Sequence, residues 1–111
     1  MKKVNRITKN EDFAKLVHST KPIRNECFLV YGKINDLNYG RVGISVSKKV
    51  GKAVTRNRIK RQIRAVCDKN INYSNSKHDI VIVVRATYLQ HSFFEISNSL
   101  KDILERIGRS K

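Results

Sequence analysis

The chain has 111 residues, enough for one domain with a single modest hydrophobic core but not for two. Its formal net charge of +15 far exceeds what solubility requires and predicts strong, salt-sensitive attraction to a polyanion. No apolar run approaches the roughly 20 residues that a membrane-spanning helix needs, and the N-terminal stretch lacks the apolar segment of a signal peptide. We therefore expect a single domain over residues 1–111, located in the cytosol, with nucleic acid favoured over a membrane surface as its partner.

The N-terminal part of the chain predicts a basic arm and a short helix. Residues 1–7 form the arm, and the motif Thr8-x-x-Glu11 resembles a capping box, in which the two side chains bind free backbone N–H groups. Apolar residues then recur at helical spacing, at Phe13, Leu16 and Val17. We expect this helix to end near His18, and residues 19–25, which include the only proline, to form a loop.

Two alternating stretches, residues 27–34 and 41–47, predict half-buried antiparallel strands joined by a hairpin loop over residues 35–40. The first strand would place on one face Phe28, Val30 and Ile34, and on the other Leu29, Tyr31 and Lys33. The second would place on its core face Val42, Ile44 and Val46, and on the other the small residues Gly43, Ser45 and Ser47. Small side chains there could leave a shallow trough for the backbone of another chain, although a plain exposed strand is the alternative.

The basic residues are concentrated between Lys48 and Arg64, and no acidic residue occurs in residues 37–67. Thr55 is placed to cap a helix that begins near Arg56. Four apolar residues of this helix share one stripe: Ile59, Ile63, Val66 and Cys67. The margin and the opposite side carry polar or basic residues: Arg56, Asn57, Arg58, Lys60, Arg61 and Arg64.

This basic helix breaks two local rules. The like-charged pairs formed by Arg56, Lys60 and Arg64 each destabilise an isolated helix by roughly 0.2–0.5 kcal/mol. Arg56 and Arg58 also lie near a helix N-terminus, whose partial positive charge disfavours cations. Violations of local consistency are expected at functional sites, and phosphate groups bound by arginines and by helix N–H groups would compensate for them. A solvated basic surface without a ligand is the alternative.

The C-terminal part predicts a buried strand and a capped helix. Residues 68–77 are polar and predict a surface loop. The β-branched run Ile80–Val84 is typical of a central strand covered on both faces, parallel to a preceding strand. The capping box Ser92-x-x-Glu95 predicts a last helix that stops at Gly108. Its apolar positions are Phe93, Ile96, Leu100, Ile103, Leu104 and Ile107.

The sequence contains no arrangement typical of a protein nuclease, which needs clustered carboxylates for metal ions or a histidine pair. His18, His78 and His91 are spread over loops and the ends of elements. Cys27 and Cys67 are interpreted as reduced core thiols, because neither has the spacing of a metal or redox motif. We expect neither catalytic residues nor metal ligands in this chain, and no nucleotide hydrolysis.

The basic segment resembles the signature of the protein subunit of bacterial ribonuclease P, which is known for its Arg-Asn-Arg motif. The matching positions are Val50, Ala53, Arg56, Asn57, Arg58, Ile59, Lys60, Arg61 and Arg64. The resemblance extends along most of the chain. The order of the expected elements, a helix, two or three strands, the basic helix, a strand and a last helix, already predicts a single α+β domain with helices against one sheet. The resemblance further implies the order αβββαβα, a four-stranded sheet and a left-handed βαβ crossover, a fold shared with the second domain of a ribosomal protein.

The same resemblance implies a ribonucleoprotein in which the RNA subunit cleaves the 5′ leader from precursor tRNA, with Mg²⁺ held mainly by the RNA and none by the protein alone. The implied partners are ribonuclease P RNA and the precursor tRNA leader, with neither a membrane nor DNA. The residues implied to contact the catalytic RNA are Lys48, Lys49, Lys52, Arg56, Asn57, Arg58, Lys60, Arg61 and Arg64. The implied leader cleft, between the first helix and the sheet, contains Phe13, Val17, Tyr31, Ser45 and Lys49.

Two positions depart from the family pattern, and two other functions compete with it. Val17 stands where relatives often carry a second aromatic residue, so it is either a weaker part of the cleft or simply core. Glu26 is acidic where the family has a basic or polar residue, and it could narrow the edge of the cleft. A structural RNA-binding protein of the ribosomal type fits the charge and size equally well. A helix-turn-helix DNA binder is disfavoured, because the segment before Arg56 predicts a strand and a loop.

Overall fold

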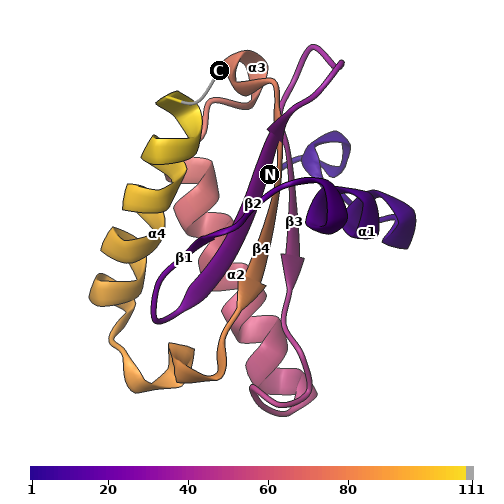
Figure 1. Ribbon diagram of the computed structural model, residues 1–111. Helices are drawn as coiled ribbons and strands as arrows, with labels where there is room; N and C mark the ends of the chain where they lie inside the picture. Colours follow the sequence, from indigo (N-terminus) through magenta and orange to yellow (C-terminus); the bar gives the residue numbers. More distant parts are fainter. Residues whose placement is uncertain (110–111) are drawn as a thin grey trace.

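The computed structural model describes residues 1–109 and has the predicted α+β architecture, with helices packed on one four-stranded sheet (Figure 1). The elements in chain order are η1 (Lys3–Asn5), α1 (Asn10–Ser19), β1 (Ile23–Arg24), β2 (Phe28–Ile34), β3 (Arg41–Ser45), α2 (Ala53–Asn70), α3 (Tyr73–Ser76), β4 (His78–Val84), η2 (Ala86–Gln90) and α4 (Phe93–Arg109). Apart from the short helices η1, α3 and η2, this is the predicted αβββαβα order. No helix in residues 1–109 has both the length and the apolar character needed to cross a membrane.

The sheet is mixed, with strand order β1-β2-β4-β3. β3 and β4 pair in parallel, as predicted, whereas β2 is antiparallel to both β1 and β4. The predicted hairpin between β2 and β3 is wrong, because β4 lies between these strands and pairs with both. A strand with two apolar faces is most stable at the centre of a sheet, where both faces are covered, and β4 is such a strand.

Helices cover the two faces of the sheet unequally. Figure 1 shows α2 and α4 against one face and the shorter α1 against the other. The main core lies under α2 and α4, where Phe28, Ile82 and Leu100 have no accessible surface. A smaller cluster under α1 contains Ile7, Leu16 and Val81. The side of the sheet that carries α1 therefore has less hydrophobic cover than the opposite side.

The first helix begins later than the capping-box motif predicts. α1 starts at Asn10, and the threonine at position 8 makes no capping hydrogen bond. The preceding chain is extended along the free edge of β3, where Arg6 pairs with Val42 and the N–H of Ile7 donates to the Val42 carbonyl (3.0 Å). Because Ile7 is buried under α1, this pairing is fixed, and the chain can turn into a helix only after it.

The basic helix begins earlier than predicted. α2 starts at Ala53, after Lys52, so Thr55 lies inside the first turn and does not cap the helix. The N–H of Arg56 donates to the Lys52 carbonyl (2.9 Å), which closes this turn. Burial of Val50 in the main core forces the chain to turn soon after β3, so the helix starts at once. The predicted apolar stripe is confirmed, with all four residues buried: Ile59, Ile63, Val66 and Cys67.

The strand boundaries differ from prediction by one or two residues. β2 begins at Phe28, β3 ends at Ser45, and β4 begins at His78. Ile34 was predicted on the core face but is 52% exposed. Ile107, near the end of α4, lies against Gly32, two residues before Ile34. The end of β2 therefore extends beyond the cover of the helices.

The capping box of the last helix is confirmed. The N–H of Glu95 donates to Ser92 Oγ (3.2 Å), and the N–H of Ser92 donates to Glu95 Oε1 (2.9 Å). The predicted stop at Gly108 is wrong, because α4 continues to Arg109. Residues 68–70, predicted as loop, are the last turn of α2, and α3 occupies part of the same stretch.

Candidate nucleic-acid interface

The helix α2 carries cations that no acidic side chain of residues 1–109 neutralises by a direct ion pair. Its apolar stripe is fixed in the core by Ile59 and Ile63, so its remaining sides face outward. The residues predicted to contact the catalytic RNA are all exposed or partly exposed: Lys48, Lys49, Lys52, Arg56, Asn57, Arg58, Lys60, Arg61 and Arg64. Within residues 1–109, no carboxylate forms an ion pair with any of them. We call these nine residues the α2 cationic face.

The acidic residues closest to this helix in sequence are engaged with other groups. Asp68, in the last turns of α2, accepts from the N-terminal ammonium of Met1 (2.7 Å) and from the Tyr73 hydroxyl (3.0 Å). Asp79, in β4, accepts two hydrogen bonds from Arg41, at 2.9 and 2.6 Å. These carboxylates therefore do not reduce the positive potential of the α2 cationic face by direct pairing.

The pair of Arg41 and Asp79 joins β3 to β4 at the end of the sheet next to α1. Burial raises the pKa of Asp79, but hydrogen bonds from Arg41 and Asn35 and the charge of Arg41 outweigh it, so the pKa is lowered overall. Asp12 of α1 lies 3.5 Å from the same guanidinium. This group of charges therefore holds α1 against the sheet.

Arg56 differs from the other cations of α2 because its Nε is buried without a hydrogen-bond partner among the described residues. Because this Nε is sealed from the surroundings, an outside ligand can reach only the terminal nitrogens of the partly exposed side chain. Phosphate oxygens suit the planar guanidinium, which can bind them through two parallel hydrogen bonds. Any phosphate bound by Arg56 would therefore be held by its two terminal Nη groups.

A second surface lies beside α1, on the face of the sheet opposite α2. Phe13, Val17, Tyr31 and Val83 are partly buried there and pack against the small hydrophobic cluster under α1. The strand register places Ser45 opposite Val83. The structure thus brings four of the five predicted cleft residues to one face.

The predicted trough along β3 is partly filled. A Cβ atom on Gly43 would lie 2.5 Å from Cζ of Phe13, so the phenylalanine ring covers this glycine. Ser45 is the next residue of β3 on the same face as Gly43, and it keeps part of its surface accessible. Lys49, the fifth predicted cleft residue, lies beyond the end of β3 in the exposed turn that leads to α2. Val17 is half-buried and packs in the hydrophobic cluster, so it contributes to the core under α1.

Three residues of this surface were missed in the sequence. Val83, which lies opposite Ser45, also pairs with Leu29, and Leu29 pairs with Arg24. These four residues form one row across the sheet. Leu29 and Val83 keep part of their surface accessible. Alternation had already grouped Leu29 with Tyr31, but the uninterrupted apolar run of β4 gave no signal of which face Val83 occupies.

Two of the three histidines contact other groups of the protein. His78 is buried and donates from Nδ1 to the Ser76 carbonyl (2.6 Å). His91 lies between Glu26 (3.0 Å) and Glu95 (3.7 Å). Glu26 therefore faces the junction of η2 and α4. No group of three or more histidine, cysteine or acidic side chains in the described part of the chain could hold a metal ion.

The two cysteines are free and buried, as predicted. Burial, with a smaller contribution from Asp68, raises the pKa of the Cys67 thiol to about 12. Burial also raises the pKa of Cys27. Both thiols are therefore protonated at neutral pH and act as core residues.

The α+β fold and the α2 cationic face together define a small protein that binds a polyanion. The chain matches the family Ribonuclease P over residues 1–108. It therefore belongs to this family of protein components of a tRNA-processing endoribonuclease. This membership also decides against the alternative of a ribosomal structural protein.

Relatives and solved structures agree with this assignment. The chain is 41% identical over 108 residues to the ribonuclease P protein component of Mycoplasma mycoides, covering 96% of this chain and 99% of that protein. It resembles the RNase P protein of Staphylococcus aureus with a TM-score of 0.81 and 36% identity, over 92% of this chain and 94% of that one. For the RNase P protein of Thermotoga maritima the TM-score is 0.76 and the identity 29%, over 96% and 97% of the two chains.

Proposed function

We propose that this chain binds ribonuclease P RNA through the α2 cationic face, and the 5′ leader of precursor tRNA through the sheet surface beside α1. By doing so it assists the removal of the leader that gives the mature tRNA 5′ end. The observation that carries the proposal is the set of cations on and before α2, which have no carboxylate partner in the part of the chain that the structure describes. Such a surface is unfavourable in isolation and is stabilised by phosphate groups.

The contact with the catalytic RNA is assigned to the nine residues of the α2 cationic face. Each arginine or lysine that neutralises a phosphate releases counterions, so affinity falls with salt concentration. Arginine also binds phosphate in a fixed, bidentate geometry, which orients the RNA on the helix.

The contact with the leader is assigned to Phe13, Val17, Tyr31 and Ser45, with Lys49 at the edge. Aromatic rings stack on unpaired bases with little sequence preference, and hydroxyl and ammonium groups bind the sugar–phosphate backbone. The open row that includes Leu29 and Val83 continues this surface past α1. A surface of this chemistry suits leaders of different sequence.

We assign the chemical step to the RNA subunit, with Mg²⁺ held mainly by the RNA and none by this chain alone. The protein then lowers the magnesium requirement, because its cations replace part of the charge screening that folded RNA and bound substrate need. We place this function in the cytoplasm, with neither DNA nor a membrane as partner. A-form and single-stranded RNA suit the two surfaces.

The first experiment reconstitutes the chain with its cognate RNA at low magnesium concentration and measures leader cleavage. We expect the chain to increase the rate; an unchanged rate would remove the proposal. Arg56→Ala and Arg61→Ala should each weaken RNA binding, and the slope of log K against log salt should become shallower by about 0.7–0.9 per lost phosphate contact. Lys101→Ala, an exposed lysine of α4, is the matched control and should leave the slope unchanged.

A second experiment tests leader binding by the sheet surface independently of RNA binding by α2. Tyr31→Ala should weaken binding of precursor tRNA by about 1–3 kcal/mol, the usual contribution of one stacked base. Binding of tRNA without a leader should not change. Equal losses for both substrates would contradict the assignment of the leader to this face, while leaving the assignment of α2 intact.

A further inference from the structure

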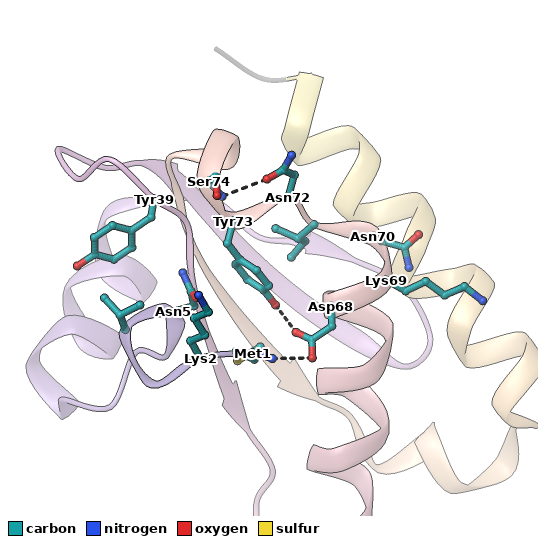
Figure 2. Close-up of a pocket in the computed structure, with 12 residues that line it drawn as sticks. Met1, Lys2, Asn5, Tyr39, Asp68, Lys69, Asn70, Asn72, Tyr73 and Ser74 are labelled. Carbon is teal, nitrogen blue, oxygen red and sulfur yellow. Dashed lines mark hydrogen bonds and ion pairs between the residues drawn. The ribbon is translucent and has the colours of Figure 1, made fainter.

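A cavity that neither RNA surface uses lies at the far end of α2 from its basic first turns. It has a volume of about 850 Å³ and is formed by the N-terminal segment, the end of α2, the start of α3 and the loop before β3 (Figure 2). None of the residues assigned above to either RNA surface lines it. Its lining is Met1, Lys2, Val4, Asn5, Tyr39, Asp68, Lys69, Asn70, Ile71, Asn72, Tyr73 and Ser74.

One side chain of this cavity carries an unpaired acceptor. Asn5 is only 5% exposed, and its Nδ2 donates to the Gly40 carbonyl (2.9 Å). Because a carbonyl can only accept, this bond fixes which end of the amide is nitrogen and leaves Oδ1 on the other side. No described residue donates to Oδ1, and Oδ1 is not sealed from the surroundings. A buried amide held in this way is ready to accept a hydrogen bond from a ligand.

The charges of the cavity favour an anion over a cation. Its only carboxylate, Asp68, is bound by the Met1 ammonium and the Tyr73 hydroxyl, as the dashed lines of Figure 2 show. That pair is neutral overall, so Lys2 and Lys69 make the lining positive. The carboxylate is thus already satisfied, and phosphate is the suitable charged group for the lysines.

Aromatic side chains complete the lining. In the view of Figure 2, Asn5 lies between Tyr39 and Tyr73. The Tyr73 hydroxyl is used by Asp68, whereas Tyr39 is half-buried and its ring carries no hydrogen bond in the described structure. A ring, a fixed amide acceptor and nearby lysines are the groups that recognise an unpaired nucleotide.

We propose that this cavity receives one unpaired nucleobase of the RNA that lies on α2, with a base N–H donating to Asn5 Oδ1 and the ring stacking on Tyr39. This inference rests on the proposed function, because it takes α2 as the RNA-binding helix. Asp68 follows Arg64 by one helical turn, about 6 Å along the axis, so a strand bound at Arg64 reaches the cavity without leaving the protein. The cavity would fix the register of the RNA, and the arginines would supply most of the affinity.

The test measures binding of the cognate ribonuclease P RNA to the full chain. Tyr39→Ser should weaken binding about tenfold, whereas Tyr39→Phe, which keeps the ring, should bind within about twofold of the unchanged protein. Urea unfolding of both variants checks that the fold is retained. Arg56→Ala serves as the reference: if Arg56→Ala weakens binding and Tyr39→Ser does not, the cavity assignment fails while the proposed function stands.

Two short probes examine the hydrogen bond and the source of the base. Oligoadenosine should bind more tightly than an oligomer of purine riboside, which lacks the amino donor, and this difference should disappear in Tyr39→Ser. Equal affinity of the two oligomers would remove the role of Asn5. Saturable binding of free adenosine monophosphate, with no effect of Tyr39→Ser on RNA binding, would overturn the proposal and assign the cavity to a free nucleotide.

Discussion

Replacing Gly43 by alanine tests the packing that shapes the surface beside α1. The added Cβ would lie 2.5, 3.0 and 3.1 Å from three ring carbons of Phe13. Ordinary carbon contacts are about 3.5–4.0 Å, so the ring must move by about 1 Å. Overpacking of this kind costs about 1–3 kcal/mol. Since the ring is at the end of a half-exposed side chain, we expect the lower half of this range.

A second substitution separates this clash from any backbone effect. Gly43 does not have a positive φ angle, so alanine fits the backbone, and the smaller entropy of the unfolded chain favours alanine by about 0.4–1 kcal/mol. In a Phe13→Leu background, which lacks the outer ring atoms, Gly43→Ala should therefore be neutral or stabilising. Urea unfolding followed by circular dichroism measures both effects. The same loss of stability in both backgrounds would refute the contact between Gly43 and Phe13.

The matched control for function is Gly32→Ala, on the opposite face of the sheet. There the added Cβ would lie 2.9 Å from Cγ2 of Ile107 in α4. Both substitutions should reduce stability, but only Gly43→Ala should weaken binding of precursor tRNA relative to tRNA without a leader. Equal effects of the two on leader binding would mean that lost stability, and not the position of the Phe13 ring, limits binding.

Three further predictions concern stability and reactivity. Ser92→Ala removes the acceptor for the Glu95 N–H and should lower the free energy of unfolding by about 1 kcal/mol in urea. The lowered pKa of Asp79 means that its stabilising effect is complete above the ordinary pKa of about 3.9 and is lost as pH falls through the lower folded value. Asp79→Asn should therefore be less stable than the unchanged protein at pH 7, with a smaller difference below about pH 3; a constant difference would contradict this. Cys67, whose pKa burial raises to about 12, should resist a thiol reagent at pH 8 until urea unfolds the chain, and rapid native labelling would show that it is not sealed in the core.

The sequence alone was sufficient where the governing contacts are local. The stripe of Ile59 and Ile63 is buried because helical periodicity places these residues on one side, whatever they pack against. The Ser92 and Glu95 capping box formed because its two partners are three residues apart. The concentration of cations between Lys48 and Arg64 is likewise a property of the sequence, and it predicted the basic surface and the class of partner.

Boundaries and pairings that depend on distant segments could not be predicted. Thr8 has the spacing of a cap, yet it does not cap, because the neighbouring Ile7 hydrogen-bonds to Val42, 35 residues away in the sequence. The hairpin expected between β2 and β3 does not form, because β4 comes later in the chain and separates them. The local sequence preferences at Thr8 and in the loop 35–40 contribute less free energy than the burial that accompanies these long-range pairings.

The sequence by itself determined that this is one α+β domain with a cationic helix and an apolar central strand, because charge pattern and hydrophobic periodicity depend only on residues that are close together in the chain. Only the tertiary structure decided how surfaces are assembled from separate segments. It placed the Phe13 ring over Gly43 and held Asn5 by the Gly40 carbonyl, with one oxygen unpaired. Such positions depend on the packing of elements that lie far apart in the chain, and no local pattern specifies them.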